Sequence, residues 1–215
     1  MKNKIGLIAG TILLLIGIFF AGMKIYHKQE AQRLGFIAKE DFKKFVPDYA
    51  PRLGAKDAQV YLVEFLDPEC ESCREFYPYV KAILEENPGK VQLVVRYAPF
   101  HGNSKFIIKI LEAARKQNRY WEALEVLFRY QPYWGSHHNP QPELVWKYLP
   151  EAGVDIAKIQ KDMKDPAIDK MIEQELRDVD ALGVRGTPSF FVNGKPLEIF
   201  GFEQLRSLVR EALQE

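Results

Sequence analysis

The stretch "VEFLDPECESCREF", residues 63–76, contains both cysteines of the 215-residue chain and decides how its surroundings are interpreted. Cys70 and Cys73 are three positions apart, so on a helix they lie about one turn apart on nearly the same face. The run "QVYLVEFL" at 59–66 is rich in β-branched and aromatic residues, which predicts a buried central strand. A helix should follow from Cys70 to about Glu86, where "NPG" ends it.

Two thiols at this spacing serve three kinds of site. A structural zinc site needs about four ligands, but the chain has no second cysteine pair, and His137 and His138 are adjacent rather than spaced as ligands usually are. Cu(I), which accepts two thiolates, is the metal that remains open. A structural disulfide over so short a loop removes little entropy from the unfolded chain. Redox exchange is therefore the favoured interpretation.

The expected position of Cys70 gives a physical reason for redox chemistry. A sulfur at the start of a helix lies near unpaired amide hydrogens and the positive end of the helix dipole, which favour the thiolate. The thiolate is the form that attacks a disulfide. Cys73, one turn further along, is placed to close a disulfide with Cys70 or to resolve a mixed disulfide with a substrate. We therefore predict that Cys70 is the nucleophile and Cys73 the resolving thiol.

The remaining sequence predicts an α/β fold around this motif. A second buried strand, "VQLVVRY" at 91–97, completes a right-handed βαβ unit. Residues 104–130 show helical periodicity, and two or three more helices are expected within 141–182. Asn-Gly at 193–194 lies between two apolar runs and predicts an antiparallel hairpin. The chain closes with an amphipathic helix, "FEQLRSLVREAL".

Two motifs together resemble a known family. "VEFLDPECESC" and "GVRGTPSFFVNG" are similar to the thioredoxin superfamily, specifically to its DsbA-like branch of thiol-disulfide oxidoreductases. The resemblance covers residues 57–215. It implies a thioredoxin fold, βαβ followed by ββα, with an all-helical subdomain inserted at about 104–182. The predicted order of strands and helices agrees with that expectation, although a fold alone does not establish a function.

The resemblance also implies further site residues. In that family a buried acid six residues before the first cysteine assists proton transfer, and Glu64 has this position. A carboxylate in an apolar strand is costly unless it is used or paired, which supports the same role. The family places a cis-proline beside the dithiol, matched here by Thr187 and Pro188, where the backbone of Thr187 would pair with an extended substrate.

Three further residues are predicted at the substrate-binding surface, and the acids near Cys70 affect the expected redox potential. Glu71 and Ser72 lie between the cysteines, and His101 lies in a loop at the carboxyl end of the second strand, where active-site loops gather. Asp67, Glu69 and Glu71 surround Cys70, whereas strongly oxidising relatives carry a histidine between the cysteines. Negative neighbours oppose the thiolate, so we expect a less oxidising dithiol than in those relatives.

The first part of the chain differs sharply in composition. "IGLIAGTILLLIGIFFAGM", residues 5–23, is uncharged and about as long as a helix needs to cross a bilayer. It is longer than the apolar core of a cleavable signal and lacks a good cleavage site, so we predict an uncleaved anchor. The expected organisation is a membrane anchor at 1–28, a stalk at 29–56 and the catalytic domain at 57–215.

Composition and compartment complete the prediction. The net charge of +1 gives no basic field for nucleic acid. The absence of cysteines outside the motif suits an exported protein. We predict a single-pass protein of the bacterial inner membrane, with a periplasmic or extracytoplasmic domain that exchanges disulfides with exported cysteine-containing proteins and with a membrane or extracytoplasmic redox partner. No cofactor is expected. The alternative is an anchored chaperone or Cu(I)-binding module without redox turnover.

Overall fold

The computed structural model describes residues 11–26, 29, 42–136 and 138–215. The predicted anchor and stalk therefore lie partly outside the described residues, as does His137. Residues 11–26 form a helix with exposed side chains. Within the described parts of the chain, no helix combines the length and the apolar character that a membrane crossing requires.

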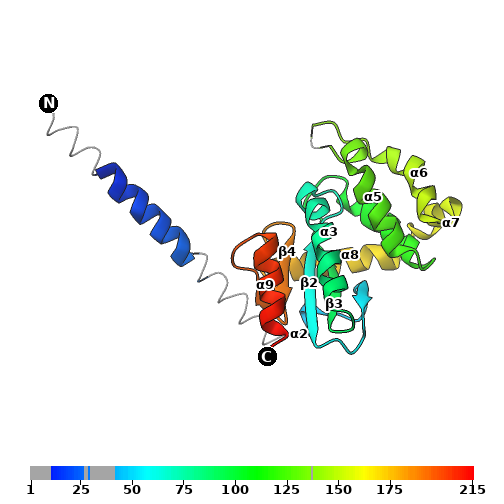
Figure 1. Cartoon of the computed structure of the whole chain (residues 1–215). Helices are drawn as coiled ribbons and strands as arrows, with labels where there is room; N and C mark the ends of the chain where they lie inside the picture. The colour runs from blue at the N-terminus through cyan, green and yellow to red at the C-terminus, as the bar shows by residue number, and fades with distance from the viewer. Residues whose placement is uncertain (1–10, 27–28, 30–41, 137) are drawn as a thin grey trace.

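A five-stranded mixed sheet forms the centre of the fold, with the strand order β1-β3-β2-β4-β5. Its two central strands, β2 (Val60–Leu66) and β3 (Val91–Tyr97), are parallel and are joined by α3 (Glu71–Glu86), as the sequence predicted (Figure 1). On the other side of β2, β4 (Ser189–Val192) is antiparallel, and β5 (Lys195–Pro196) pairs with it across the predicted Asn-Gly turn. The βαβ and ββ halves are thus confirmed.

The structure extends the compact domain into the segment predicted as a stalk. The strand β1 (Arg52–Gly54) pairs antiparallel with β3, after a short helix α2 (Phe42–Phe45). The side chain of Phe45 is fully buried and packs its ring 4.7 Å from that of Phe191. The boundary placed at residue 57 is therefore too late. A strand of three residues between proline and glycine breaks is too short to show a periodic pattern.

The described residues between β3 and β4 are predominantly helical and match the predicted insertion. The segment of helical periodicity at 104–130 forms two helices, and Asn118, in the turn between them, adopts a left-handed conformation with φ of 56°. Two later helices begin at aspartate caps, Asp155 and Asp165, whose side chains accept backbone N–H groups. The helices are α4 (Ser104–Arg115), α5 (Tyr120–Trp134), α6 (Val145–Tyr148), α7 (Ile156–Asp162) and α8 (Pro166–Ala181), with 3-10 turns at Pro142–Leu144 and Leu149–Ala152.

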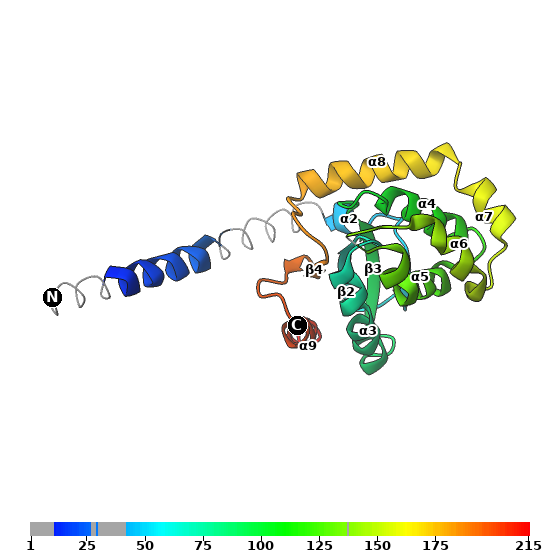
Figure 2. The same ribbon diagram turned by 90° about the horizontal axis from the view of Figure 1, so that it is seen from above.

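Helices cover both faces of the sheet. On one face, α3 packs beside α9 (Phe202–Ala212), and on the other lie α8 and the segment containing α2 (Figure 2). Alternate residues of β2 enter the two cores, with Leu62 and Leu66 on the α3 face and Val63 and Phe65 on the α8 face. The carboxyl end of β2 opens into the loop that carries Cys70, and α5 of the insertion packs against α3 beside it.

Candidate active site

Cys70 is positioned by the junction of strand and helix. It is the N-cap residue of α3, with an extended backbone (φ −74°, ψ 123°), so its side chain lies at the open end of the helix. Its Sγ contacts the carbonyl oxygen of Thr187 at 3.2 Å, and the Thr187-Pro188 peptide bond is cis, as the resemblance implied. Both cysteines are free thiols. The structure thus unites the two motifs that are more than a hundred residues apart in sequence.

The two thiols have opposite electrostatic environments. A hydrogen bond from the Cys73 side chain lowers the pKa of Cys70 to about 6 against the opposing effect of burial. The side chain of Thr187 and the backbone N–H groups of Cys73 and Ser72 lower it further. Cys73 itself is fully buried. Desolvation raises its pKa well above the usual value, and its bond to Cys70 and the charge of Glu64 add to this. Cys70, which is 7% exposed, is therefore the thiolate, and the fully buried Cys73 is its hydrogen-bond donor.

Glu64 lies in β2 beneath the dithiol. It is 1% exposed and sits in register with Val95 of β3 and Phe190 of β4. Neither carboxylate oxygen has a hydrogen-bond partner within the described residues. Desolvation, together with the charge of Cys70, raises the pKa of Glu64 to about 8. The carboxyl group is thus neutral at neutral pH and titrates just above it.

The acid Asp67 does not oppose the Cys70 thiolate in the simple way that the sequence suggested. Its buried carboxylate accepts hydrogen bonds from the N–H of Phe100 at 2.8 Å and from the hydroxyl of Ser104 at 2.6 Å. The Nδ1 of His101 lies 2.8 Å from the same carboxylate. Burial opposes the protonation of His101, but the bond to Asp67 and the charges of Asp67, Cys70 and Glu69 raise its pKa. Asp67 therefore holds a histidine near the dithiol.

The carboxylate of Glu69 is also bonded to the loop before α4. Its carboxylate accepts hydrogen bonds from the backbone N–H and the side-chain amide of Asn103, both at 2.7 Å. These bonds join the motif to the loop before α4 and occupy both oxygens of Glu69. Glu71 is exposed to solvent, where its charge is strongly screened. The acidic sequence around Cys70 thus has a weaker effect on the thiolate than its composition predicts.

Gln131, in α5, is a site residue that the sequence analysis missed. Its Nε2 donates to the carbonyl oxygens of Pro68 at 2.9 Å and Cys70 at 3.0 Å. Its side chain is 1% exposed. The helical insertion is thereby bonded directly to the backbone that presents the nucleophile. A single glutamine inside an amphipathic helix carries no sequence signal for such a contact.

The predicted substrate contacts have different degrees of exposure. Glu71 is exposed, Ser72 and Thr187 are half-buried, and Pro188 is buried beneath the dithiol. His101 is bound to Asp67, and its contact with substrate stays a prediction. Across the described residues, no group of three or more histidine, cysteine and acidic side chains is arranged to hold a metal.

Comparison with known proteins assigns the family. The family model described as thioredoxin matches residues 48–211. The chain belongs to this thioredoxin family. A solved thioredoxin-like oxidoreductase from Silicibacter pomeroyi is 30% identical, with a TM-score of 0.70 over 80% of this chain and 98% of that one. The catalytic domain of Proteus mirabilis ScsC, at 21% identity and a TM-score of 0.70 over 85% and 99% of the two chains, has the same fold.

Curated relatives are of two kinds. The probable disulfide bond formation protein D of Bacillus anthracis is 28% identical over 172 residues, which cover 76% of this thioredoxin-family chain and 78% of the relative. The Na⁺/H⁺ antiporter NhaA of Herminiimonas arsenicoxydans is 28% identical over 193 residues, which cover 87% of this chain and 30% of the antiporter. The chain thus spans less than a third of the length of these antiporter relatives.

Proposed function

We propose that this chain is a protein disulfide oxidoreductase that exchanges disulfides with exported cysteine-containing proteins through a mixed disulfide on Cys70. One observation carries the proposal. Cys70 lies at the N-terminus of α3 in contact with the Thr187 carbonyl, its thiolate is stabilised, and Cys73 is sealed beneath it. This arrangement separates an attacking sulfur from a resolving sulfur.

The exchange proceeds in two balanced steps. In the reducing direction, the Cys70 thiolate attacks one sulfur of a substrate disulfide, forms the mixed disulfide and releases the other substrate sulfur as a thiolate. Cys73 then loses its proton and attacks Cys70, which forms the Cys70–Cys73 disulfide and releases the second substrate sulfur. The substrate gains two electrons and the dithiol loses them. The oxidising direction is the reverse of both steps.

Glu64 is the proposed proton acceptor for the second step. Cys73 has a strongly raised pKa and must lose its proton before it attacks. The charge of Glu64 contributes to that raised pKa, so the two groups interact in the buried interior. With a pKa of about 8, a minor fraction of Glu64 is ionised at neutral pH. This ionised form accepts the proton of Cys73, at an energetic cost of about 1–2 kcal/mol for its formation.

We place the domain outside the cytoplasm on a single N-terminal anchor of the bacterial inner membrane. The support is the uncharged run at 5–23 and the restriction of cysteine to the active-site motif. The proposed partners are exported proteins with cysteines and a membrane or extracytoplasmic redox protein that restores the dithiol. Fractionation of cells that make the full chain, followed by protease accessibility from outside the cytoplasmic membrane, tests this placement.

The trapping experiment tests the chemistry. The Cys73→Ala variant should accumulate mixed disulfides with substrate proteins, because the resolving thiol is absent, and Cys70→Ser should form none. The reduction potential of the wild-type pair then shows the direction of exchange. With a Cys70 pKa of about 6, we expect a less oxidising couple than the −120 mV or so of the most acidic relatives. Binding of one Cu(I) per chain with no thiol exchange would instead support the binding module.

A further inference from the structure

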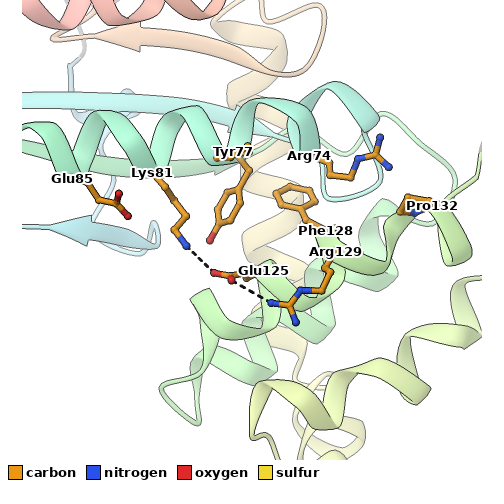
Figure 3. Close-up of a pocket in the computed structure, with 9 residues that line it drawn as sticks. Arg74, Tyr77, Lys81, Glu85, Glu125, Phe128, Arg129 and Pro132 are labelled. Carbon is orange, nitrogen blue, oxygen red and sulfur yellow. Dashed lines mark hydrogen bonds and ion pairs between the residues drawn. The ribbon is translucent and has the colours of Figure 1, made fainter.

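A groove lies between α3 and α5, and Arg74, the residue after Cys73, lines one end of it (Figure 3). We call it the α3–α5 groove, and its volume is about 650 Å³. At one end, Arg74 follows Cys73 in the chain and its N–H donates to the carbonyl of Cys70. On the facing helix, Pro132 follows Gln131, which bonds the same carbonyl. This end of the groove is therefore adjacent to the backbone that carries Cys70.

The floor of the groove suits an apolar side chain. The rings of Tyr77 and Phe128 meet there with their centroids 5.3 Å apart. Exposed prolines, Pro78 in α3 and Pro132 in α5, lie within the helices that form the walls. Each proline lacks the N–H that would bond the carbonyl four residues earlier, which belongs to Arg74 or to Phe128.

The charged side chains in the middle of the groove are paired. Glu125 pairs with Lys81 at 3.0 Å and with Arg129 at 3.4 Å, as the dashed lines in Figure 3 show. The charged side chains at the two ends of the groove have weak ion pairs or none among the described residues. The Arg74 guanidinium, with its side chain 27% exposed, pairs within the described residues only with Glu75, at 3.7 Å. Glu85 at the other end makes no ion pair with any described residue.

Arg74 makes one end of the groove positive and Glu85 makes the other end negative. They lie on the groove side of α3 with Tyr77 and Lys81 between them, and the eleven residues from one to the other correspond to about 17 Å of helix. An extended polypeptide covers that length with about five residues. A carboxylate near the reacting cysteine would meet Arg74, and a basic side chain about five residues further would meet Glu85.

We propose that the α3–α5 groove binds the substrate segment next to its reacting cysteine, and that it selects segments with an acidic residue near the cysteine, an apolar residue beyond it and a basic residue at the far end. This rests on the proposed function, because the mixed disulfide on Cys70 places the segment. Arg74 binds the acid as a two-pronged donor, and the Tyr77 and Phe128 rings receive the apolar side chain.

The test uses synthetic peptides and the full chain carrying Cys73→Ala. Each peptide has one cysteine, held as a disulfide with 2-mercaptoethanol, and the rate of formation of the Cys70–peptide disulfide is followed by mass spectrometry. One peptide has Glu near the cysteine, Leu next and Lys five residues beyond the Glu. A second has Glu and Lys exchanged, and both are made with the cysteine at either end. We expect roughly a threefold to tenfold faster reaction for the first arrangement.

Variants locate the preference in the groove. Arg74→Glu and Glu85→Lys together should reverse the preference, whereas Arg210→Glu, an equal change of charge to Arg74→Glu at an exposed site on α9, should leave it intact. Rates are divided by the rate with the disulfide of 2-mercaptoethanol alone, which corrects for altered reactivity of Cys70. Equal rates for the two peptides, or a preference that the double variant does not change, would overturn the groove proposal. No reaction with either peptide or with the small disulfide would instead refute the proposed function itself.

Discussion

Each face of the sheet buries a glutamate, and the two differ in whether the carboxylate has a hydrogen-bond partner. On the α3 face, Glu64 of β2 has no hydrogen-bond partner among the described residues, and burial raises its pKa to about 8. On the α8 face, Arg96 of β3 donates from Nε to both oxygens of Glu175 at 3.0 Å and from Nη2 to Asp178 at 2.6 Å. Arg96 and Glu175 are both at most 1% exposed.

The Arg96 cluster stabilises the fold, whereas Glu64 is available for proton transfer. The Arg96 cluster joins β3 to α8 and, through Lys44, to the segment before β1, so it fixes the last helix of the insertion and the N-terminal segment to the sheet. Burial raises the pKa of Glu175 as well, but Arg96 opposes that rise, whereas no cation opposes it at Glu64. Glu64, two strand positions before Leu66 and close to the dithiol, stays unpaired at a cost in stability.

Loss of Arg96 should have the largest effect. Arg96→Met leaves Glu175 and Asp178 buried without their cation, so we expect the free energy of unfolding to fall by about 3–5 kcal/mol. Urea denaturation of the reduced protein measures this, with Arg185→Met at an exposed position as the matched control. The alkylation rate of Cys70 in the folded variant should be unchanged. A loss below about 1 kcal/mol would show that the cluster is not a structural support.

Replacement of Glu64 should raise the free energy of unfolding, whereas replacement of Arg96 should lower it. Its folded pKa of about 8 lies above the usual 4.5, so the folded chain holds a proton that the unfolded chain releases. The stability from this proton is complete below about pH 4.5 and is lost as the pH rises through about 8. Glu64→Gln removes that loss, and it should therefore stabilise the protein by up to about 3 kcal/mol at pH 7.

The measurement for Glu64 is a series of urea denaturations between pH 4.5 and pH 8. The advantage of Glu64→Gln over the wild type should grow with pH, while Glu71→Gln, an exposed control, should run parallel to the wild type. The same variant should slow release of substrate from the mixed disulfide, because Cys73 loses its proton acceptor. Parallel pH profiles for Glu64→Gln and the wild type would contradict a buried, titrating acid.

The smallest effect is expected for His101→Asn, measured as a shift in the pH midpoint of Cys70 alkylation. The Cys70 alkylation rate of the wild type should rise with pH through a midpoint near 6, where the thiolate forms. His101→Asn removes the positive charge that Asp67 holds near the dithiol, so the midpoint should move upward by less than about one pKa unit. His138→Asn, at an exposed loop position, is the control. A midpoint that stays in place would show that His101 only positions the loop.

The sequence predicted the reactive residues of the site better than the hydrogen bonds that surround them. The spacing of Cys70 and Cys73, the strand before them and the resemblance around Pro188 were enough to predict the thioredoxin fold and the pairing of the two motifs. The hydrogen bonds of Asp67 and Glu69 could not be predicted, because their partners lie in the loop before α4, more than thirty residues away in the chain. Gln131 could not be found, since its partners are backbone carbonyls more than sixty residues away in the chain.

What the sequence by itself determined is local: periodicity gave the strands and helices, and a three-residue spacing placed both sulfurs on one helical turn. Tertiary structure alone decided which buried acid is paired and which is left to titrate, because that depends on whether a cation from another segment reaches it. Glu64 and Glu175 are the same residue type at equal burial, but the Arg96 guanidinium and the Tyr97 N–H reach Glu175, and no described group bonds Glu64.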